Sequence, residues 1–196
     1  MSYGSGMARS KTFDVDAAVD KAMEVFWANG FGGTTPQQLV DALGIGRGSL
    51  YNAFDNKHAL YERALRRYYE RETVRLIEVL DGPGPARERL RAAVELVVDA
   101  AREDRRGCMM ANAAVEFGAA DEVVNHLVRR TFERQEAAFR STVEEGQRAG
   151  EIDPAADARA LASFLLTTIN GIRVLAKADP DPRRLADLAG TALRAL

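Results

Sequence analysis

The sequence predicts an all-α fold of about nine helices, in which a small three-helix N-terminal domain precedes a larger helical domain. Apolar residues recur with helical spacing along the chain, and no stretch shows the alternation of a half-buried strand. Two short helices around a glycine turn fall within residues 34–54, and the segment DGPGP at 81–85 is the clearest break. We expect the other helices over residues 14–29, 57–80, 86–103, 108–117, 121–148, 154–177 and 182–196.

Composition narrows the class of protein. The chain has 196 residues, 46% of them hydrophobic, which is enough to bury a sizeable core. The net charge of −2 argues against a protein that coats nucleic acid by bulk charge. One cysteine cannot form an internal disulfide and fits a reducing cytoplasm. We also expect no membrane span and no signal peptide, and hence a cytoplasmic protein without a membrane partner.

The paired short helices have the sequence TTPQQLVDALGIGRGSLYNAF at residues 34–54. Thr35 is a good N-cap, Pro36 suits the first helical position, and Gln38 completes a capping box. Gly44 can adopt the left-handed conformation that ends a helix. Two short helices joined by such a turn form a helix-turn-helix, whose second helix enters the major groove of DNA.

The second helix of this unit carries the candidate DNA contacts. Arginine reads guanine with two hydrogen bonds and asparagine reads adenine, so Arg47 and Asn52 are candidates for base contacts. The hydroxyl groups of Ser49 and Tyr51 suit phosphates, and Gly48 leaves room for a close approach to the groove. The alternative is that these residues are only the hydrated face of a short helix.

The order FWANGFGGTTPQQLVDALGIGRGSLYNAFDNKHALYERAL closely resembles the N-terminal domain of the TetR family of one-component repressors. The resemblance covers roughly residues 13–68; beyond them the chain matches the family only in length and helical character. It implies that Tyr51 contacts a phosphate and that Arg47 contacts a base or a phosphate. It also places Thr35 and Gln38 near one DNA strand and Lys57 at a phosphate. Gly46 departs from the family pattern, because a Ser or Thr usually caps the recognition helix there.

The resemblance also implies a domain organisation and a mechanism. We expect a disordered leader at residues 1–12, a helix-turn-helix DNA-binding domain at 13–56, and a ligand-binding and dimerisation domain at 57–196, with helix 57–80 connecting them. Such a protein is a ligand-responsive repressor. It binds double-stranded, palindromic operator DNA as a homodimer and is released by a small-molecule or reactive inducer. No cofactor and no metal are expected.

A polar stripe predicts one wall of a ligand pocket. In RRGCMMANAAVEFGAA, residues 105–120, Cys108, Asn112 and Glu116 lie at i, i+4 and i+8 on a helix rich in small residues. Convergent polar groups beside apolar ones are typical of small-molecule sites. Residues that could line the remainder are Tyr68, Phe132, Phe139, Phe164 and Thr168, although each aromatic ring could equally be plain core.

Cys108 itself has two interpretations. Arg105 and Arg106 precede it and it opens a helix, and both features favour a reactive thiolate. The alternative is a small, inert core residue.

The helix ALASFLLTTINGIRVLA, residues 160–176, is apolar on every side. Such a helix is buried all round, and one small domain supplies only part of that cover. We therefore expect a dimer interface on its surplus face, with Leu188 from the last helix beside it. The candidate residues on that face are Leu166, Ile169, Asn170 and Arg173. A central core helix in a monomer is the alternative.

Two other functions compete with the repressor. One is a helical ligand-binding or scaffold protein that no longer binds DNA. The other is a helical enzyme, but the chain contains no phosphate-binding loop, nucleophile elbow or Cys/His metal cluster. His58 and His126 both look like surface helix residues. We therefore expect no enzymatic activity.

Overall fold

The computed structural model describes residues 14–196, and the leader expected at 1–12 lies outside them. The described residues form nine continuous helices and no strand, which confirms the all-α prediction. One helix contains a π-helical turn, η1, so that its α-helical parts carry the separate labels α4 and α5. The elements are α1 (Val15–Asn29), α2 (Pro36–Leu43), α3 (Arg47–Phe54), α4 (Lys57–Tyr68), η1 (Tyr69–Thr73), α5 (Val74–Leu80), α6 (Ala86–Glu103), α7 (Met109–Phe117), α8 (Glu122–Ala149), α9 (Ala158–Ala178) and α10 (Pro182–Arg194).

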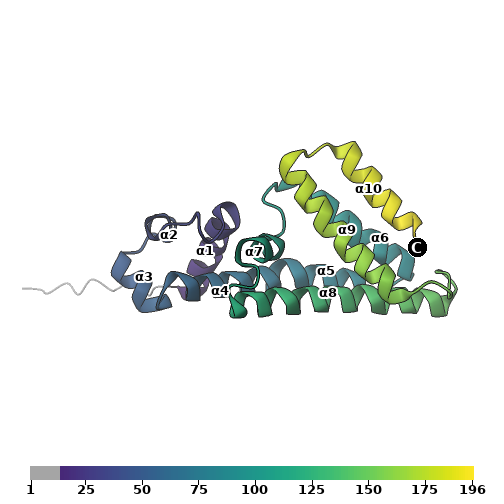
Figure 1. Ribbon diagram of the computed structural model, residues 1–196, viewed down its shortest axis with the longest axis horizontal. Coiled ribbons are helices and arrows are strands. Elements are labelled where there is room, and N and C mark those ends of the chain that lie inside the picture. Colours follow the sequence, from purple (N-terminus) through teal and green to yellow (C-terminus); the bar gives the residue numbers. More distant parts are fainter. Residues whose placement is uncertain (1–13) are drawn as a thin grey trace, which may run out of the picture.

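The molecule is elongated, with a small head at one end (Figure 1). Helices α1, α2 and α3 form the head. The α4–η1–α5 helix and α8 run along the length of the molecule, while α6, α9 and α10 pack at the opposite end (Figure 1). The short helix α7 lies between the two groups and packs against α8 and α4.

Polar caps fix most helix starts where the sequence predicts them. The Thr35 hydroxyl and the Gln38 amide oxygen form the expected capping box at α2. At α9 the expected start at residue 154 is wrong, because the Asp157 side chain accepts hydrogen bonds from the N–H groups of Arg159 and Ala160 and begins the helix there. The helix therefore starts after Asp157, whose side chain has two backbone partners, and not at Pro154.

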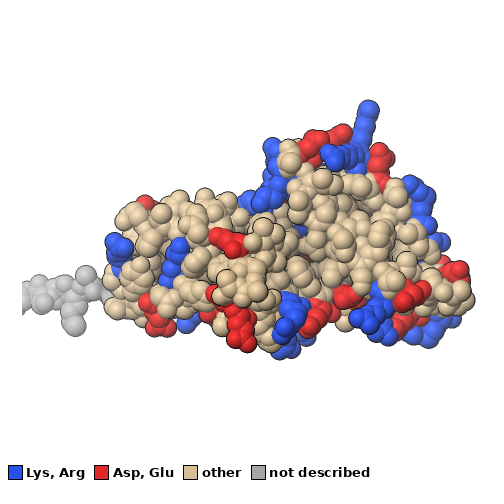
Figure 2. Space-filling view, viewed as in Figure 1, with Lys and Arg blue, Asp and Glu red and all other residues tan. Residues whose placement is uncertain are grey.

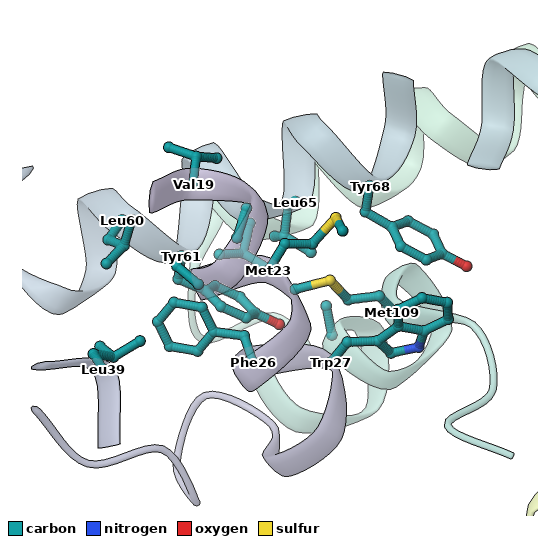
Figure 3. Packing of buried hydrophobic residues seen from close by; sticks show 14 of the residues in the cluster. Val19, Met23, Phe26, Trp27, Leu39, Leu60, Tyr61, Leu65, Tyr68 and Met109 are labelled. Atoms are coloured by element: carbon teal, nitrogen blue, oxygen red, sulfur yellow. The ribbon is translucent and has the colours of Figure 1, made fainter. Parts of the chain in front are cut away.

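Two hydrophobic clusters divide the core. The first joins the head to α4, to α7 and to the start of α8, and Figure 3 labels ten of its residues, from α1, α2, α4 and α7. The second joins α5, α6, α9 and α10 to the rest of α8. The packing changes from one cluster to the other at the π turn Tyr69–Thr73. Such turns widen a helix locally and are frequent at functional sites.

Helix α9 is long and apolar enough to cross a membrane by length and composition, although the sequence analysis expected no such segment. Core helices of soluble proteins pass the same test, and a third of its most apolar window is buried within the chain. Leu165, Ile169 and Ile172 are buried against α6 and α8. The helix therefore serves this chain as a core element.

The inner and outer faces of α9 differ from the prediction. Ile169 and Arg173, expected at a dimer surface, are 0% and 8% exposed and belong to the interior of their own chain. The assignment of these two residues to a dimer surface is therefore wrong. The outward face instead carries Phe164, 44% exposed, and Val174, 55% exposed. The surface over α9 is largely free of charged side chains (Figure 2).

Candidate DNA-binding surface and ligand cavity

The helix-turn-helix is held by local hydrogen bonds and a small apolar core. The Gln38 backbone N–H donates to the Thr35 hydroxyl at 3.2 Å, and the Thr35 N–H donates to the Gln38 amide oxygen at 2.7 Å. Gly44 ends α2 with φ +69°, a conformation that favours glycine. Leu39 and Leu50 are buried, so both helices are fixed to the head. The relative position of α2 and α3 is thus set by packing and not by DNA.

Helix α3 leaves its polar face free. Arg47, Gly48, Ser49 and Asn52 are exposed, and Tyr51 is half-buried. The α3 side chains expected to contact DNA, those of Arg47, Ser49, Tyr51 and Asn52, make no hydrogen bond or ion pair with any other residue in the described part of the chain. A Cβ added at Gly48 would meet nothing within 4 Å, so the helix surface is open there. The free donors and acceptors suit contacts with an external partner.

Lys57 has an internal role that the sequence did not reveal. Its Nζ donates to the backbone oxygens of Phe31 and Thr34, both at 2.9 Å, and lies 4.1 Å from the centre of the Phe31 ring. An ammonium group has three donors, so one remains. Any contact of Lys57 with a phosphate would use that donor while the lysine holds the loop between α1 and α2.

Glu116 was expected in a ligand pocket, but it points toward the head. Its Oε2 accepts a hydrogen bond from the Phe31 N–H at 2.9 Å, and its Oε1 accepts one from the Gly32 N–H at 2.5 Å. A Cβ at Gly30, where φ is +73°, would lie 3.0 Å from the carboxylate. The glycines before α2 therefore allow a close approach of α7, and Glu116 ties the two elements together.

A second link joins the start of α4 to the start of α8. His58 pairs with Asp121, the N-cap of α8, and with Glu62 at 3.1 Å. The Val124 N–H and His58 hold the pKa of Asp121 below its ordinary value of 3.8, so it is ionised at neutral pH. Phe117 of α7 packs against His58, with ring centroids 6.5 Å apart. Both α7 and α8 thus contact the elements that carry α3.

A cavity of about 150 Å³ lies at the end of α4, beside Tyr68 and the π turn. Its walls come from α1, α4, the π turn, α5, α6 and α9. Trp27, Tyr68 and Met109 lie close together at this end of the first cluster (Figure 3). Trp27 and Tyr68 both line the cavity. The ring centroids of these two residues are 5.0 Å apart, and the Trp27 indole N–H donates to the Gly107 oxygen at 2.9 Å.

The residues predicted to bind a ligand do not converge on one pocket, and Tyr68 alone among them lines this cavity. Asn112 donates to the Arg106 oxygen at 3.0 Å and contacts the Lys177 amine at 3.3 Å. Phe132 packs against the first cluster and Phe139 lies in the second, while Phe164 is on the outer surface. Cys108 is the N-cap of α7, Asn112 and Glu116 lie within the helix, and the three side chains have different partners. Thr168 donates to the Phe164 oxygen of its own helix.

Cys108 is buried, 3% exposed, at the N-cap of α7. Its neighbouring cation is Arg173 of α9, and not the adjacent arginines of the sequence. Arg105 donates to the Lys177 oxygen, and Arg106 pairs with Asp104. Arg173 also lines the cavity, so the residue assigned to a dimer surface belongs to the candidate ligand site. The position of Arg173 in its helix did not predict that it faces the cavity, because the sequence does not say which face of α9 lies toward Tyr68.

Comparison with known proteins identifies the chain. Residues 18–64 match the family described as "Bacterial regulatory proteins, tetR family", and residues 77–192 match "Tetracyclin repressor-like, C-terminal domain". The chain belongs to the TetR family of transcriptional regulators. The second match shows that the family relationship extends through the helices after residue 76, where the sequence analysis found only similar length and helical character.

Two curated TetR-type relatives cover nearly the whole chain. The uncharacterised regulator YezE of Bacillus subtilis is 31% identical over 193 residues, 97% of this chain and 100% of its own length. The repressor ComR of Escherichia coli is 30% identical over 189 residues, 95% of this chain and 90% of its own. Together with the family match, they identify the protein as a TetR-family transcriptional repressor and not an enzyme.

Solved TetR structures share the fold. A cysteine variant of the TetR regulator CifR, in complex with a 26-bp operator duplex, is 31% identical and has a TM-score of 0.85 over 95% of this chain and 98% of its own. The reduced form of NemR from E. coli has a TM-score of 0.81 over 91% of this chain and 94% of its own; at 19% identity it supports the fold alone. The head of the present structure therefore has the architecture of a TetR DNA-binding domain.

Proposed function

We propose that this TetR regulator is a cytoplasmic, ligand-responsive repressor that binds a palindromic operator as a homodimer. The observation that carries the proposal is the polar face of α3, whose side chains have no partner within residues 14–196. The CifR complex with operator DNA supports the same use of this helix. In the proposed complex Arg47 and Asn52 read bases, while Ser49 and Tyr51 contact phosphates.

The outward face of α9 supports the homodimer. Phe164, Thr167, Gly171 and Val174 follow a three–four–three spacing, which places them in one seam of a helix pair. Nothing lies within 4 Å of a Cβ added at Gly171, so a partner helix could approach closely there. Leu188 of α10 is half-buried. Two copies joined along α9 and α10 would present two recognition helices to half-sites about 34 Å apart.

In this proposal a ligand releases the operator by a population shift between two states of the dimer, which differ in the distance between the two heads. A ligand can move this equilibrium only by binding one spacing more tightly than the other. Near-complete release requires on the order of 5 kcal/mol of differential affinity. The links through Glu116 and through His58 and Asp121 connect α7 and α8 to the head, and they are the proposed route of the change.

The test is binding to the DNA upstream of the protein's own gene. A labelled duplex should show binding by fluorescence anisotropy, and the affinity should fall as salt rises. Arg47→Ala should weaken binding by about 1–3 kcal/mol and relax preference at particular bases. Arg140→Ala, on an exposed part of α8 beside Glu144, is the matched control and should bind as the parent does. Equal binding by the parent and Arg47→Ala would show that α3 is not the reading helix.

A further inference from the structure

The cavity beside the π turn has the size of a small ligand. Its volume of about 150 Å³ equals that of an engineered protein cavity that accepts benzene. Trp27, Tyr68 and Ala101 give it an apolar wall. The cavity also contains charged side chains, and the balance among them indicates what it would bind.

Arg173 is a buried cation without a carboxylate partner. Its side chain lines the cavity and is 8% exposed, and no ion pair joins it to any acidic residue within 14–196. The Cys108 thiol hydrogen-bonds with it, and Tyr68, Cys108 and, more weakly, Glu72 act on its charge. A guanidinium group stays charged in proteins, and a buried charge without a counter-ion is unfavourable. The interior thus holds a positive charge that an anion would compensate.

The carboxylates on the cavity wall are already paired. Arg71 donates to Glu72 at 3.0 Å, and Arg106 donates to Asp104 at 2.5 Å. Direct hydrogen bonding to Arg106 lowers the pKa of Asp104, so this acid is ionised and matched by its own arginine. Glu72 acts on the charge of Arg173 from a distance, but neither acid forms an ion pair with Arg173.

The remaining charged groups of the cavity are at its edge. Arg75 and Glu103 are exposed and carry opposite charges, so solvent screens both. Burial raises the pKa of Tyr68 well above its ordinary value, which keeps the phenol protonated at neutral pH. A protonated phenol beside a guanidinium offers a second donor to the same anion.

We infer that this cavity binds a small organic monoanion, a carboxylate with a short aliphatic or single-ring body. The planar guanidinium of Arg173 suits a carboxylate, because two parallel hydrogen bonds can form. The apolar body would pack on Trp27 and Ala101. This inference rests on the proposed function only where it makes the anion an inducer, since binding itself does not require DNA.

The position of the cavity gives the ligand a route to the head. Trp27 belongs to α1, whereas Arg173 belongs to α9, so one ligand would contact both parts of the molecule. The Trp27 indole also donates to Gly107, which immediately precedes Cys108 and α7. A ligand that shifts Trp27 therefore acts on α1 and on the start of α7 together.

Trp27 makes the site directly measurable, because it is the single tryptophan of the chain. The full-length protein would be titrated with butyrate, hexanoate and benzoate while the tryptophan emission is recorded. The matching amides butyramide, hexanamide and benzamide, and sodium chloride and phosphate at equal ionic strength, are the controls. We expect a saturable change and a rise in Tm with at least one carboxylate, and amides at least about tenfold weaker.

Variants assign the binding to one arginine. Arg173→Gln should weaken carboxylate binding by at least about tenfold, whereas Arg173→Lys should retain part of it, because it keeps the charge. Arg140→Gln, on an exposed part of α8 outside the cavity, is the matched control and should stay within about threefold of the parent. If Arg173→Gln does not fold, the comparison of carboxylates with amides on the parent protein still tests whether the cavity prefers an anion. Absent carboxylate binding, or equal binding of the amides, overturns the inference.

Operator binding measured in the same titrations separates this inference from the proposed function. Carboxylate binding that leaves the operator bound would support the site and remove its role as an inducer site. Operator release by neutral compounds, with no carboxylate bound, would overturn the anion site while supporting the repressor.

Discussion

The carboxylate of Glu116 on α7 accepts a 2.5 Å hydrogen bond from the backbone N–H of Gly32, in the loop that leads into α2. The same carboxylate accepts the N–H of Phe31, so one side chain holds two adjacent peptide groups. Helix α7 is short, and its other end begins at Cys108, next to the cavity residues Tyr68 and Arg173. A displacement at that end would be transmitted along α7 to the loop before the helix-turn-helix.

Glu116→Gln tests this link. The amide keeps one acceptor but places an NH₂ group against a backbone N–H, so one hydrogen bond is lost. Because the site is exposed, we expect the free energy of unfolding to fall by only about 0.5–1.5 kcal/mol, measured with urea. The larger expected effect is functional: the inducer should release the operator less completely than it does in the parent. Glu78→Gln is the control, because Glu78 is exposed on α5 and its side chain makes no hydrogen bond or ion pair with another described residue. Unchanged release in Glu116→Gln would exclude this route.

Lys57 and Arg47 should behave differently although both were predicted to contact DNA. Lys57→Ala leaves the carbonyl oxygens of Phe31 and Thr34 without their cation, so we expect a loss of about 1–2 kcal/mol of unfolding free energy as well as weaker binding to every sequence. Arg47→Ala should weaken binding without changing Tm, because its side chain is exposed and makes no hydrogen bond or ion pair within residues 14–196. Urea unfolding beside anisotropy separates the two. An unchanged unfolding curve in Lys57→Ala would show that its two internal hydrogen bonds carry no weight.

The sequence predicted best what depends on neighbouring residues. The capping box of Thr35 and Gln38 and the end of α2 at Gly44 follow from local backbone requirements, and the structure has both. The sequence alone did not predict contacts between residues from distant segments. Glu116 lies on the predicted stripe, but its 85-residue separation from Phe31 gave no sign of their contact.

Arg173 shows the same limit in the ligand site. Its helix was recognised as apolar on all sides, and that property alone cannot say which face meets α4 and which remains open. The signal that the sequence did offer for a site at Arg173 was its lone charge in an apolar helix. A charge in a protein core is stable only when another group compensates it.

Acid should weaken the contact between the end of α6 and α1. Hydrogen bonding to Arg106 lowers the pKa of Asp104 from 3.8, and Arg106 also pairs with Glu24 of α1 at 2.5 Å. A carboxyl group whose pKa is lower in the folded state stabilises the protein above its unfolded pKa. That contribution is lost as pH falls through the folded value, here below 3.8. Asp104→Asn should therefore lose a modest stability, below about 1 kcal/mol, at neutral pH.

Urea unfolding from about pH 7 to about pH 1.5, below the lowered pKa of folded Asp104, measures this contribution. The parent and Asp104→Asn should converge at the acid end, since protonation removes from the parent what the substitution removes from the variant. Asp99→Asn, on the exposed face of α6, is the matched control. Parallel curves for the parent and Asp104→Asn down to the lowest pH would contradict the assignment.

The two faces of α9 give the last prediction. Val174 is 55% exposed on the proposed dimer seam, so Val174→Glu should leave each chain folded while placing a charge in the interface. Sedimentation should then show folded monomers, and operator binding should fall because one chain presents only one recognition helix. Ile169→Glu, only five residues away, buries a charge inside the chain itself and should lower Tm strongly or prevent folding. A parent protein that sediments as a stable monomer, or a Val174→Glu variant that remains dimeric, would remove the seam from α9; a well-folded monomer of Ile169→Glu would instead place Ile169 at the interface.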